Sequence, residues 1–220
     1  YAIQDRKVAP RTSISAKVVS NLITNAGANR IVTVDLHAGQ IQGFFDIPVD
    51  NLFTTPLFAR YIKKKFKNKN LVCVSPDVGG VQRTRGLATK IKADLAIIDK
   101  RRPAPGKSQV MNIIGEVKGK NCIIVDDIID SGGTIVNAVE ALKKAGAVDV
   151  YVFITHAVLS GEAAEKIKRS KIKKLIITDT IDNTAKIKNN SKFEVISIAP
   201  LMAEAINRIS NSTSVSDLFN

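Results

Sequence analysis

Short apolar runs alternate with amphipathic segments along most of this chain. Runs such as Leu71–Ser75 and Cys122–Val125 are rich in Val, Ile and Leu, which is typical of parallel strands buried on both faces. Between such runs, apolar residues recur at helical spacing, for example at 18–23. The repeated order of strand, loop and helix predicts an α/β fold in which open parallel sheets carry helices on both faces.

The same pattern gives each expected element an approximate range. Ser13 or Ser15 is expected to cap a first helix that stops near Gly27, and Thr55 to cap a second helix at 56–66. A short turn or helix is expected at Gln40–Phe45. Further helices are expected at 81–92, 134–145, 162–170 and 201–209. Strands are expected at 30–35, 47–52, 71–75, 95–98, 110–116, 122–125, 149–155, 173–178 and 194–198.

Two copies of this strand–helix plan fit the chain. Residues 1–52 are interpreted as the remainder of a first domain, residues 53–198 as a second domain, and residues 199–220 as a closing helix and tail that return to the first. No low-complexity linker separates the two copies. The chain begins at Tyr1 rather than Met and its first element is entered partway, which favours an N-terminal truncation.

Composition narrows the class of protein. With 45% apolar residues, a chain of 220 residues can bury substantial cores. No apolar run approaches the roughly 20 residues of a membrane span, and no signal peptide is visible, so no membrane partner is expected. Cys73 and Cys122 both lie in apolar runs and are expected to be buried thiols, which favours a cytoplasmic location.

The charge balance is strongly basic, with 33 Lys and Arg against 20 Asp and Glu. Such a balance raises the hypothesis of nucleic-acid binding. Aromatic residues make up only 5% of the chain and Trp is absent, so the sequence offers few platforms on which bases could stack. A solvated basic surface is the favoured interpretation, and no nucleic-acid partner is predicted.

The stretch Asp126–Thr134 has the composition of a binding site. Asp126 and Asp127 follow a buried apolar strand, and a glycine turn with hydroxyls at Ser131 and Thr134 then opens a helix. Glycines and a helix N-terminus present backbone N–H groups to a phosphate, whereas carboxylates suit sugar hydroxyls or a cation. The stretch predicts a sugar-phosphate cradle at the carboxyl end of a sheet, with an acidic helix cap as the simpler alternative.

Two further strand ends carry groups that can bind metal or phosphate. Asp35 and His37 are two positions apart and lie on the same side of an extended segment, a spacing that suits a divalent cation or a phosphate. Taken alone, a buried histidine bonded to a carbonyl is the more common explanation. Asp77 precedes Gly79 and Gly80 at another strand end, where a helix cap is the alternative.

A run of three cations, Lys100–Arg102, opens the polar stretch Asp99–Ser108, which also contains Pro and Gly. On a loop that no periodic pattern fixes, these cations are expected to clamp phosphoryl oxygens. A solvated basic turn is the alternative.

Six motifs together carry a resemblance to a known family. They are YAIQDRK at 1–7, VDLHAGQIQGFFDIPVDNL at 34–52, SPDVGGVQR at 75–83, DKRRP at 99–103, VDDIIDSGGT at 125–134 and THAVLSG at 155–161. In this order, and over essentially the whole chain, they resemble ribose-phosphate pyrophosphokinases (phosphoribosyl pyrophosphate synthetases) of the bacterial class I type. The resemblance implies two phosphoribosyltransferase-like (type I) domains, the first incomplete.

The resemblance also implies a reaction and its site residues. In this family the diphosphoryl group of ATP is transferred to the C1 hydroxyl of ribose 5-phosphate. Lys100 and Arg102 are implied as the catalytic cations. Ribose 5-phosphate is assigned to Arg102, Asp126, Asp127, Asp130, Ser131, Gly132, Gly133 and Thr134. The nucleotide is assigned to Ile3, Gln4, Asp5, Lys7 and His37. Mg²⁺ is assigned to His37 and Asp77, with Asp35, Asp46 and Asp50 as additional candidates.

Two departures and two rival interpretations accompany the resemblance. Ile3 stands where the family usually has Arg, which removes one cation from the nucleotide site, while Ser131 replaces the commoner Thr and keeps the hydroxyl. A base-specific phosphoribosyltransferase would share Asp126–Thr134 but would have no use for the cations at 100–102. A non-catalytic subunit that assembles with a synthetase is the other rival. The family also implies a homo-oligomer, commonly a hexamer.

Overall fold

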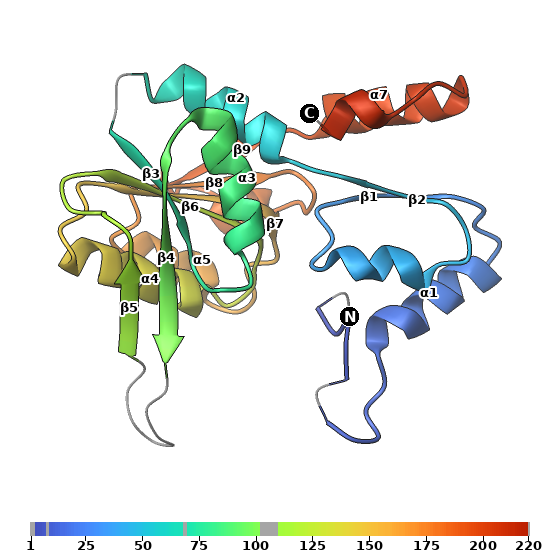
Figure 1. Ribbon diagram of the computed structural model, residues 1–220, viewed down its shortest axis with the longest axis horizontal. Helices are drawn as coiled ribbons and strands as arrows, with labels where there is room; N and C mark the ends of the chain where they lie inside the picture. The colour runs from blue at the N-terminus through green and yellow to red at the C-terminus, as the bar shows by residue number, and fades with distance from the viewer. Residues whose placement is uncertain (1–2, 8, 68–69, 102–109, 220) are drawn as a thin grey trace. The chain divides into compact units, whose positions relative to one another are not determined.

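The computed structural model describes residues 3–7, 9–67, 70–101 and 110–219. The chain divides into two compact units, Tyr1–Thr54 with Thr213–Asn220, and Thr55–Ser212 (Figure 1). The expected boundary at 52 lies two residues before this division. The last helix, which was expected to return to the first domain, is grouped with the second unit, and only the tail belongs to the first.

The first unit is built around a pair of parallel strands. Its elements are α1 (Ser15–Asn25), β1 (Ile31–Val34), the 3-10 helices η1 (Gly39–Phe44) and η2 (Ser216–Phe219), and β2 (Val49–Leu52). Strands β1 and β2 pair from Ile31 with Val49 to Val34 with Leu52. The predicted serine cap of α1 is wrong, because Ile14 is the N-cap and makes no side-chain cap bond; Ser15 Oγ donates instead to Gln4 Oε1.

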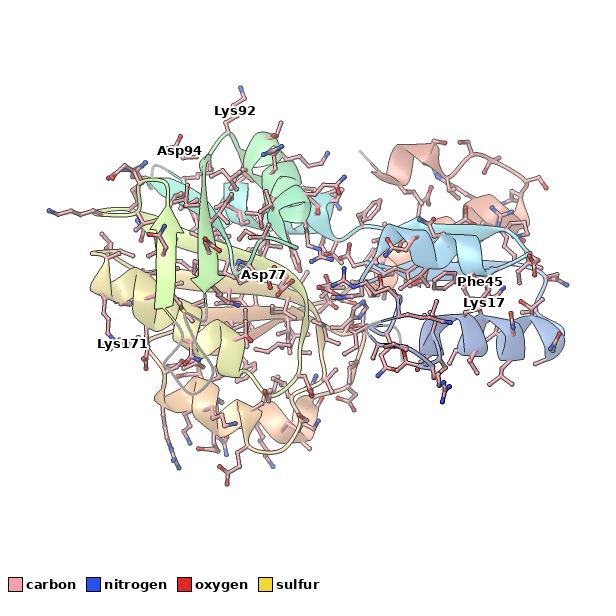
Figure 2. The ribbon with its side chains drawn as sticks, turned by 60° about the horizontal axis from the view of Figure 1, so that its bottom comes forward. Lys17, Phe45, Asp77, Lys92, Asp94 and Lys171 are labelled. Carbon is pink, nitrogen blue, oxygen red and sulfur yellow. The ribbon has the colours of Figure 1, made fainter. Side chains whose placement is uncertain are left out.

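Helix α1 is attached to the end of η1 by polar side chains. Lys17 lies beside Phe45 (Figure 2), and Lys17 Nζ donates to the Phe44 carbonyl oxygen at 2.7 Å. The hydroxyl of Ser20, a buried residue, donates to the same oxygen at 2.9 Å. These two bonds satisfy a partly buried carbonyl and attach the end of η1 to α1.

The second unit is a seven-stranded sheet in the order β5-β4-β3-β6-β7-β8-β9. Every neighbouring pair is parallel except β4 and β5, which form an antiparallel hairpin at one edge. The strands are β3 (Leu71–Ser75), β4 (Asp94–Arg101), β5 (Val110–Ile114), β6 (Asn121–Ile129), β7 (Val150–Ala157), β8 (Lys174–Thr178) and β9 (Phe193–Ile196). The helices are α2 (Thr55–Lys65), α3 (Val81–Ile91), α4 (Gly133–Lys144), α5 (Ala163–Arg169), α6 (Thr184–Ile187) and α7 (Ala199–Ser210).

Helices cover both faces of this sheet, as the apolar strand runs predict (Figure 1). On one face, α4 and α5 pack side chains such as Leu142 and Ile167 against Val72, Ile124 and Val152. On the other face, α2 and α3 pack Phe58 and Leu87 against a second set of strand residues, among them Cys73 and Ile123. The predicted α/β class with helices on both faces is confirmed.

Two strands extend further than their sequence pattern indicates. The expected strand at 95–98 continues to Arg101, because β5 pairs with it and places Lys100 opposite Met111. Lys100 was therefore wrongly expected on a loop. The expected strand at 122–125 continues to Ile129 along β7, so Asp126 and Asp127 belong to β6 rather than following it.

The turn after β5 depends on a glycine. Gly115 has φ 108°, and a Cβ at this position would lie 2.9 Å from the Leu95 carbonyl oxygen and 3.0 Å from Ala96 Cα. Gly115→Ala is therefore expected to lower the free energy of unfolding by about 2–5 kcal/mol, measured by urea denaturation. The control is Gly86→Ala in α3, where a Cβ meets nothing within 4 Å. That change should raise stability by about 0.5–1 kcal/mol. Equal effects of the two changes would contradict this explanation.

The two cysteines are free, fully buried thiols. Cys73 belongs to the core under α2 and α3, and Cys122 to the core under α4 and α5, so they lie on opposite faces of the sheet. Burial raises the pKa of both thiols to about 12, which keeps them protonated and unreactive at neutral pH.

Among the described residues, no helix has the length and apolar content needed to span a bilayer.

Candidate active site

The two acids of the second unit, Asp126 and Asp127, lie near the point where the neighbouring strand β3 ends. Pairing of β6 with β3 ends at Ile124, opposite Val74, while pairing with β7 continues to Ile129. Asp126 and Asp127 therefore extend past the end of β3 at the carboxyl edge of the sheet. In open parallel sheets this edge is where ligands bind.

Arg83 of α3 contacts both carboxylates, a role that the sequence does not reveal. Its Nη1 donates to Asp126 Oδ1 and to Asp127 Oδ1, each at 3.0 Å. The side chains of Arg83 and Asp126 are each 19% exposed, and that of Asp127 is 5% exposed. Arg83 is 43 positions from Asp126 in the sequence. The motif at 75–83 contains the arginine, but only the fold brings it to the acids.

Asp126 is the carboxyl group whose ionisation is most disturbed by this arrangement. Burial is the main cause that raises its pKa, and the neighbouring Asp127 raises it further; Arg83 acts in the opposite direction, and the result is about 7. The Asp127 backbone N–H also donates to Asp126 Oδ1 at 3.0 Å. A carboxyl group that titrates near neutral pH at the open edge of a sheet is a candidate for ligand binding.

The glycine turn after β6 forms the expected start of α4. Gly132 is the N-cap with φ 76°, a conformation that favours glycine, and no side chain caps the helix. The first N–H groups of α4 are therefore not used by a side-chain cap and can bind an anion. Asp130, Ser131 and Thr134 are exposed around this turn.

Asp77 occupies the equivalent turn between β3 and α3 (Figure 2). Its Oδ1 accepts a hydrogen bond from the Gly80 N–H at 3.0 Å, and Ser75 Oγ donates to its carbonyl oxygen at 2.6 Å. A Cβ on Gly80 would lie 3.0 Å from Ser75 Oγ, so the turn is closely packed. The N-cap of α3 is Gly80, which has no side-chain cap bond, so Asp77 holds the turn rather than capping the helix, and its role as a ligand stays a prediction.

In the first unit, most of the expected nucleotide residues line one cavity. This cavity of about 430 Å³ is lined by Ile3, Gln4, Asp5, Arg6, Thr12, Ser13 and His37. Ser15 bonds to Gln4, and Gln40 Nε2 donates to Asp5 Oδ2, so polar contacts hold the expected nucleotide segment. Lys7 is exposed and is not among the lining residues.

Two of the three additional metal candidates have structural partners. Asp35 is 4% exposed, and its Oδ2 accepts hydrogen bonds from the N–H and the hydroxyl of Thr54. Asp50 Oδ2 accepts a bond from Arg30 Nε at 2.7 Å. Asp46 is exposed. These contacts give Asp35 and Asp50 a role in holding the first unit together.

The expected metal pair is divided between the units, with His37 in the first and Asp77 in the second. Among the described residues, no group of three or more His, Cys, Asp or Glu side chains is placed to hold a metal. Mg²⁺ commonly keeps several waters and takes few protein ligands beside substrate phosphates, so this finding leaves the Mg²⁺ assignment a prediction. Lys100 lies on β4, and Arg102 falls outside the described residues.

Comparisons with known proteins identify the family of this chain. A family model described as a phosphoribosyl synthetase-associated domain matches residues 100–220. The chain is 57% identical over 220 residues to the ribose-phosphate pyrophosphokinases of Rhizobium meliloti and Agrobacterium fabrum, covering 100% of this chain and 71% of each relative. The crystal structure of phosphoribosylpyrophosphate synthetase from Mycobacterium smegmatis matches with a TM-score of 0.90 and 42% identity, covering 96% of this chain and 69% of that chain. The chain belongs to the ribose-phosphate pyrophosphokinase family.

Proposed function

We propose that this protein transfers the diphosphoryl group of ATP to the C1 hydroxyl of ribose 5-phosphate, giving 5-phosphoribosyl 1-pyrophosphate and AMP. The observation that carries the proposal is the acid pair Asp126–Asp127 followed directly by the open N-terminus of α4. Carboxylates and helix amides lie a few residues apart, which suits a ligand with hydroxyls at one end and a phosphate at the other.

The two ends of the sugar phosphate bind to these two parts of the site. The 5-phosphate accepts hydrogen bonds from the amides of the Gly132 turn and the hydroxyls of Ser131 and Thr134, at the positive end of the α4 dipole. The ring hydroxyls donate to Asp126, with Asp127 beside it. Asp130 and Gly133 complete the turn that shapes the phosphate end.

ATP is assigned to the cavity of the first unit. Gln4 and Asp5 are positioned by Ser15 and Gln40, and His37 lines the same cavity. Ile3 supplies apolar surface to this cavity and no charge, so the nucleotide relies on other groups for its phosphates. Arg6 also lines the cavity, and it is the cationic residue nearest to Ile3 in the sequence.

Mg²⁺ is a hard cation that prefers oxygen ligands, and the Asp77 carboxylate is an oxygen donor of that kind. Asp77 offers its carboxylate at the end of β3, and His37 is the second candidate ligand. When bound, Mg²⁺ neutralises charge on the phosphates of ATP.

The transfer itself requires position and charge rather than a protein nucleophile. The bond between the β-phosphorus of ATP and the oxygen that bridges it to the α-phosphorus breaks, a bond between that phosphorus and the C1 oxygen forms, and the C1 hydroxyl loses its proton. Lys100 and Arg102 are proposed to stabilise the negative charge on the transferring group. Homo-oligomer formation, a hexamer by family resemblance, and a cytoplasmic location are part of the same proposal.

A product assay tests this function. With ATP, ribose 5-phosphate and Mg²⁺, we expect AMP and 5-phosphoribosyl 1-pyrophosphate in equal amounts, resolved by anion-exchange chromatography. Omission of ribose 5-phosphate is the control and should leave ATP intact. Pyrophosphate release from 5-phosphoribosyl 1-pyrophosphate and a purine or pyrimidine base, without the first reaction, would instead identify a phosphoribosyltransferase. Binding of both substrates without turnover would identify a non-catalytic subunit.

A further inference from the structure

Arg83 is held in place by the same turn that carries Asp77. The N-terminal part of α3 is fixed by the bond from the Gly80 N–H to Asp77 Oδ1, and by the bond from Thr84 Oγ1 to the Gly80 carbonyl oxygen at 3.0 Å. Thr84 and Leu87 are fully buried. Arg83 therefore projects from a rigid helical turn, and its guanidinium reaches the acids from a defined direction.

The guanidinium joins two carboxylates that would otherwise repel each other. One nitrogen, Nη1, donates to both acids at 3.0 Å, so movement of Arg83 affects Asp126 and Asp127 together. Both acids are largely withdrawn from water, where repulsion between like charges is stronger than at the surface. Asp77 adds a third negative charge that acts on Asp126.

The acids also need a counter-charge for the ligand that they are proposed to bind. Two adjacent carboxylates close to the phosphate end of the cradle disfavour a sugar phosphate unless a cation offsets them. Arg83 provides that cation without using the hydrogen-bonding groups of the α4 turn. Its geometry thus serves both orientation and charge.

We propose that Arg83 is a positioning residue of the sugar cradle: it bridges Asp126 and Asp127 so that their remaining oxygens accept the ribose hydroxyls, and it offsets their charge toward the 5-phosphate. This inference rests on the proposed function and assigns to Arg83 a role in affinity for ribose 5-phosphate. Arg83 acts through the acids, so the diphosphoryl transfer step does not depend on it directly.

The test compares three variants with the wild-type enzyme. Arg83→Gln removes the charge, and Arg83→Lys keeps it with fewer donors. Arg85→Gln, an exposed arginine two positions along α3, is the matched control. We expect Arg83→Gln to raise the KM and the calorimetric Kd for ribose 5-phosphate about 10–100-fold while kcat changes less than threefold. Arg83→Lys should recover part of the affinity, and Arg85→Gln should resemble the wild type.

A second readout separates positioning from a purely structural role. Asp126 faces Asp127, Asp77 and Arg83, and loss of the opposing Arg83 charge raises its pKa above the value of about 7. The affinity of the wild-type enzyme for ribose 5-phosphate should fall as the pH of the solution drops through about 7. In Arg83→Gln the same fall in affinity should begin at a higher pH. A helix that is merely destabilised would lower the melting temperature without moving this profile.

The outcomes distinguish the inference from the proposed function. An unchanged Kd and pH profile in Arg83→Gln, with wild-type turnover intact, would overturn the role of Arg83 and leave the function standing. A fall in kcat at constant KM would also overturn it, because Arg83 would then act on the transferring group. Failure of the wild type to bind ribose 5-phosphate would overturn both. If Arg83→Gln does not fold, the Kd of Arg83→Lys decides: a Kd for ribose 5-phosphate between the wild-type value and an increase of about 100-fold supports the role of Arg83, and a Kd equal to that of the wild type would overturn it.

Discussion

Lys100→Ala is expected to lower kcat by about 10²–10³, while the KM for ribose 5-phosphate rises only a few-fold. The loss corresponds to about 2–4 kcal/mol of transition-state stabilisation, the usual effect of removing one group that neutralises charge in a water-poor site. Steady-state kinetics on the whole enzyme measure it. The proposed ribose cradle is on β6 and α4 rather than on β4, which is why KM and kcat should separate.

Because Lys100 lies on a strand and not on a loop, its backbone position is fixed. Pairing with Met111 holds its backbone, and the register places it on the face of the sheet that carries Ile98, a fully buried residue. Lys171→Ala, at an exposed lysine in the turn before β8 (Figure 2), removes the same charge elsewhere in the second unit and should leave kcat unchanged. An unaffected kcat in Lys100→Ala would mean that Lys100 is a solvated surface cation.

Asp126→Asn is expected to weaken ribose 5-phosphate binding about 10–100-fold, because hydrogen bonds from hydroxyls to a carboxylate are stronger than those to an amide. Calorimetry with ribose 5-phosphate alone measures this effect without turnover. Asp94→Asn is the control: Asp94 is an exposed acid of the same unit whose ion pair with Lys120 contributes little to stability. Unchanged binding in Asp126→Asn would show that the acid serves only the local structure.

The same substitution should stabilise the fold at alkaline pH. The pKa of Asp126 is raised from 3.8 to about 7, so the folded state resists its ionisation and stability is lost as the pH rises through this range. Asn carries no such charge. The melting temperature of Asp126→Asn should therefore equal that of the wild type near pH 4 and exceed it at pH 8. A variant that melts lower at pH 8 would show that Arg83 compensates the buried charge fully.

Local sequence was sufficient to predict the parts of the site that lie close together in the chain. The β-branched run before Asp126 and the glycine turn at Gly132 each specify their own conformation, and both occur where expected. The parts that failed depend on distant partners. Lys100 is polar, yet it lies in a strand because β5 pairs with it, and Arg83 meets acids 43 and 44 positions away.

The acids outside the cradle show the same dependence. Asp35 and Asp50 accept hydrogen bonds from Thr54 and Arg30, which are 19 and 20 positions distant, and their assignment as additional Mg²⁺ candidates stays a prediction. A pattern of residue types cannot tell a ligand from a structural acid when the partner is supplied by another element. The convergence of His37 and Asp77 stays a prediction for the same reason.

The one-sided extension of β6 gives the cradle a built-in spectroscopic reporter. The pairing of β6 with β3 ends at Ile124, so Asp126 and Asp127 lie past the end of β3, and the Asp127 amide donates to the side chain of Asp126. Its hydrogen exchange and its ¹⁵N chemical shift therefore depend on the carboxylate that is proposed to receive the sugar. An isotope-labelled sample could follow occupancy of the cradle through this single backbone resonance, even in a variant that no longer turns over.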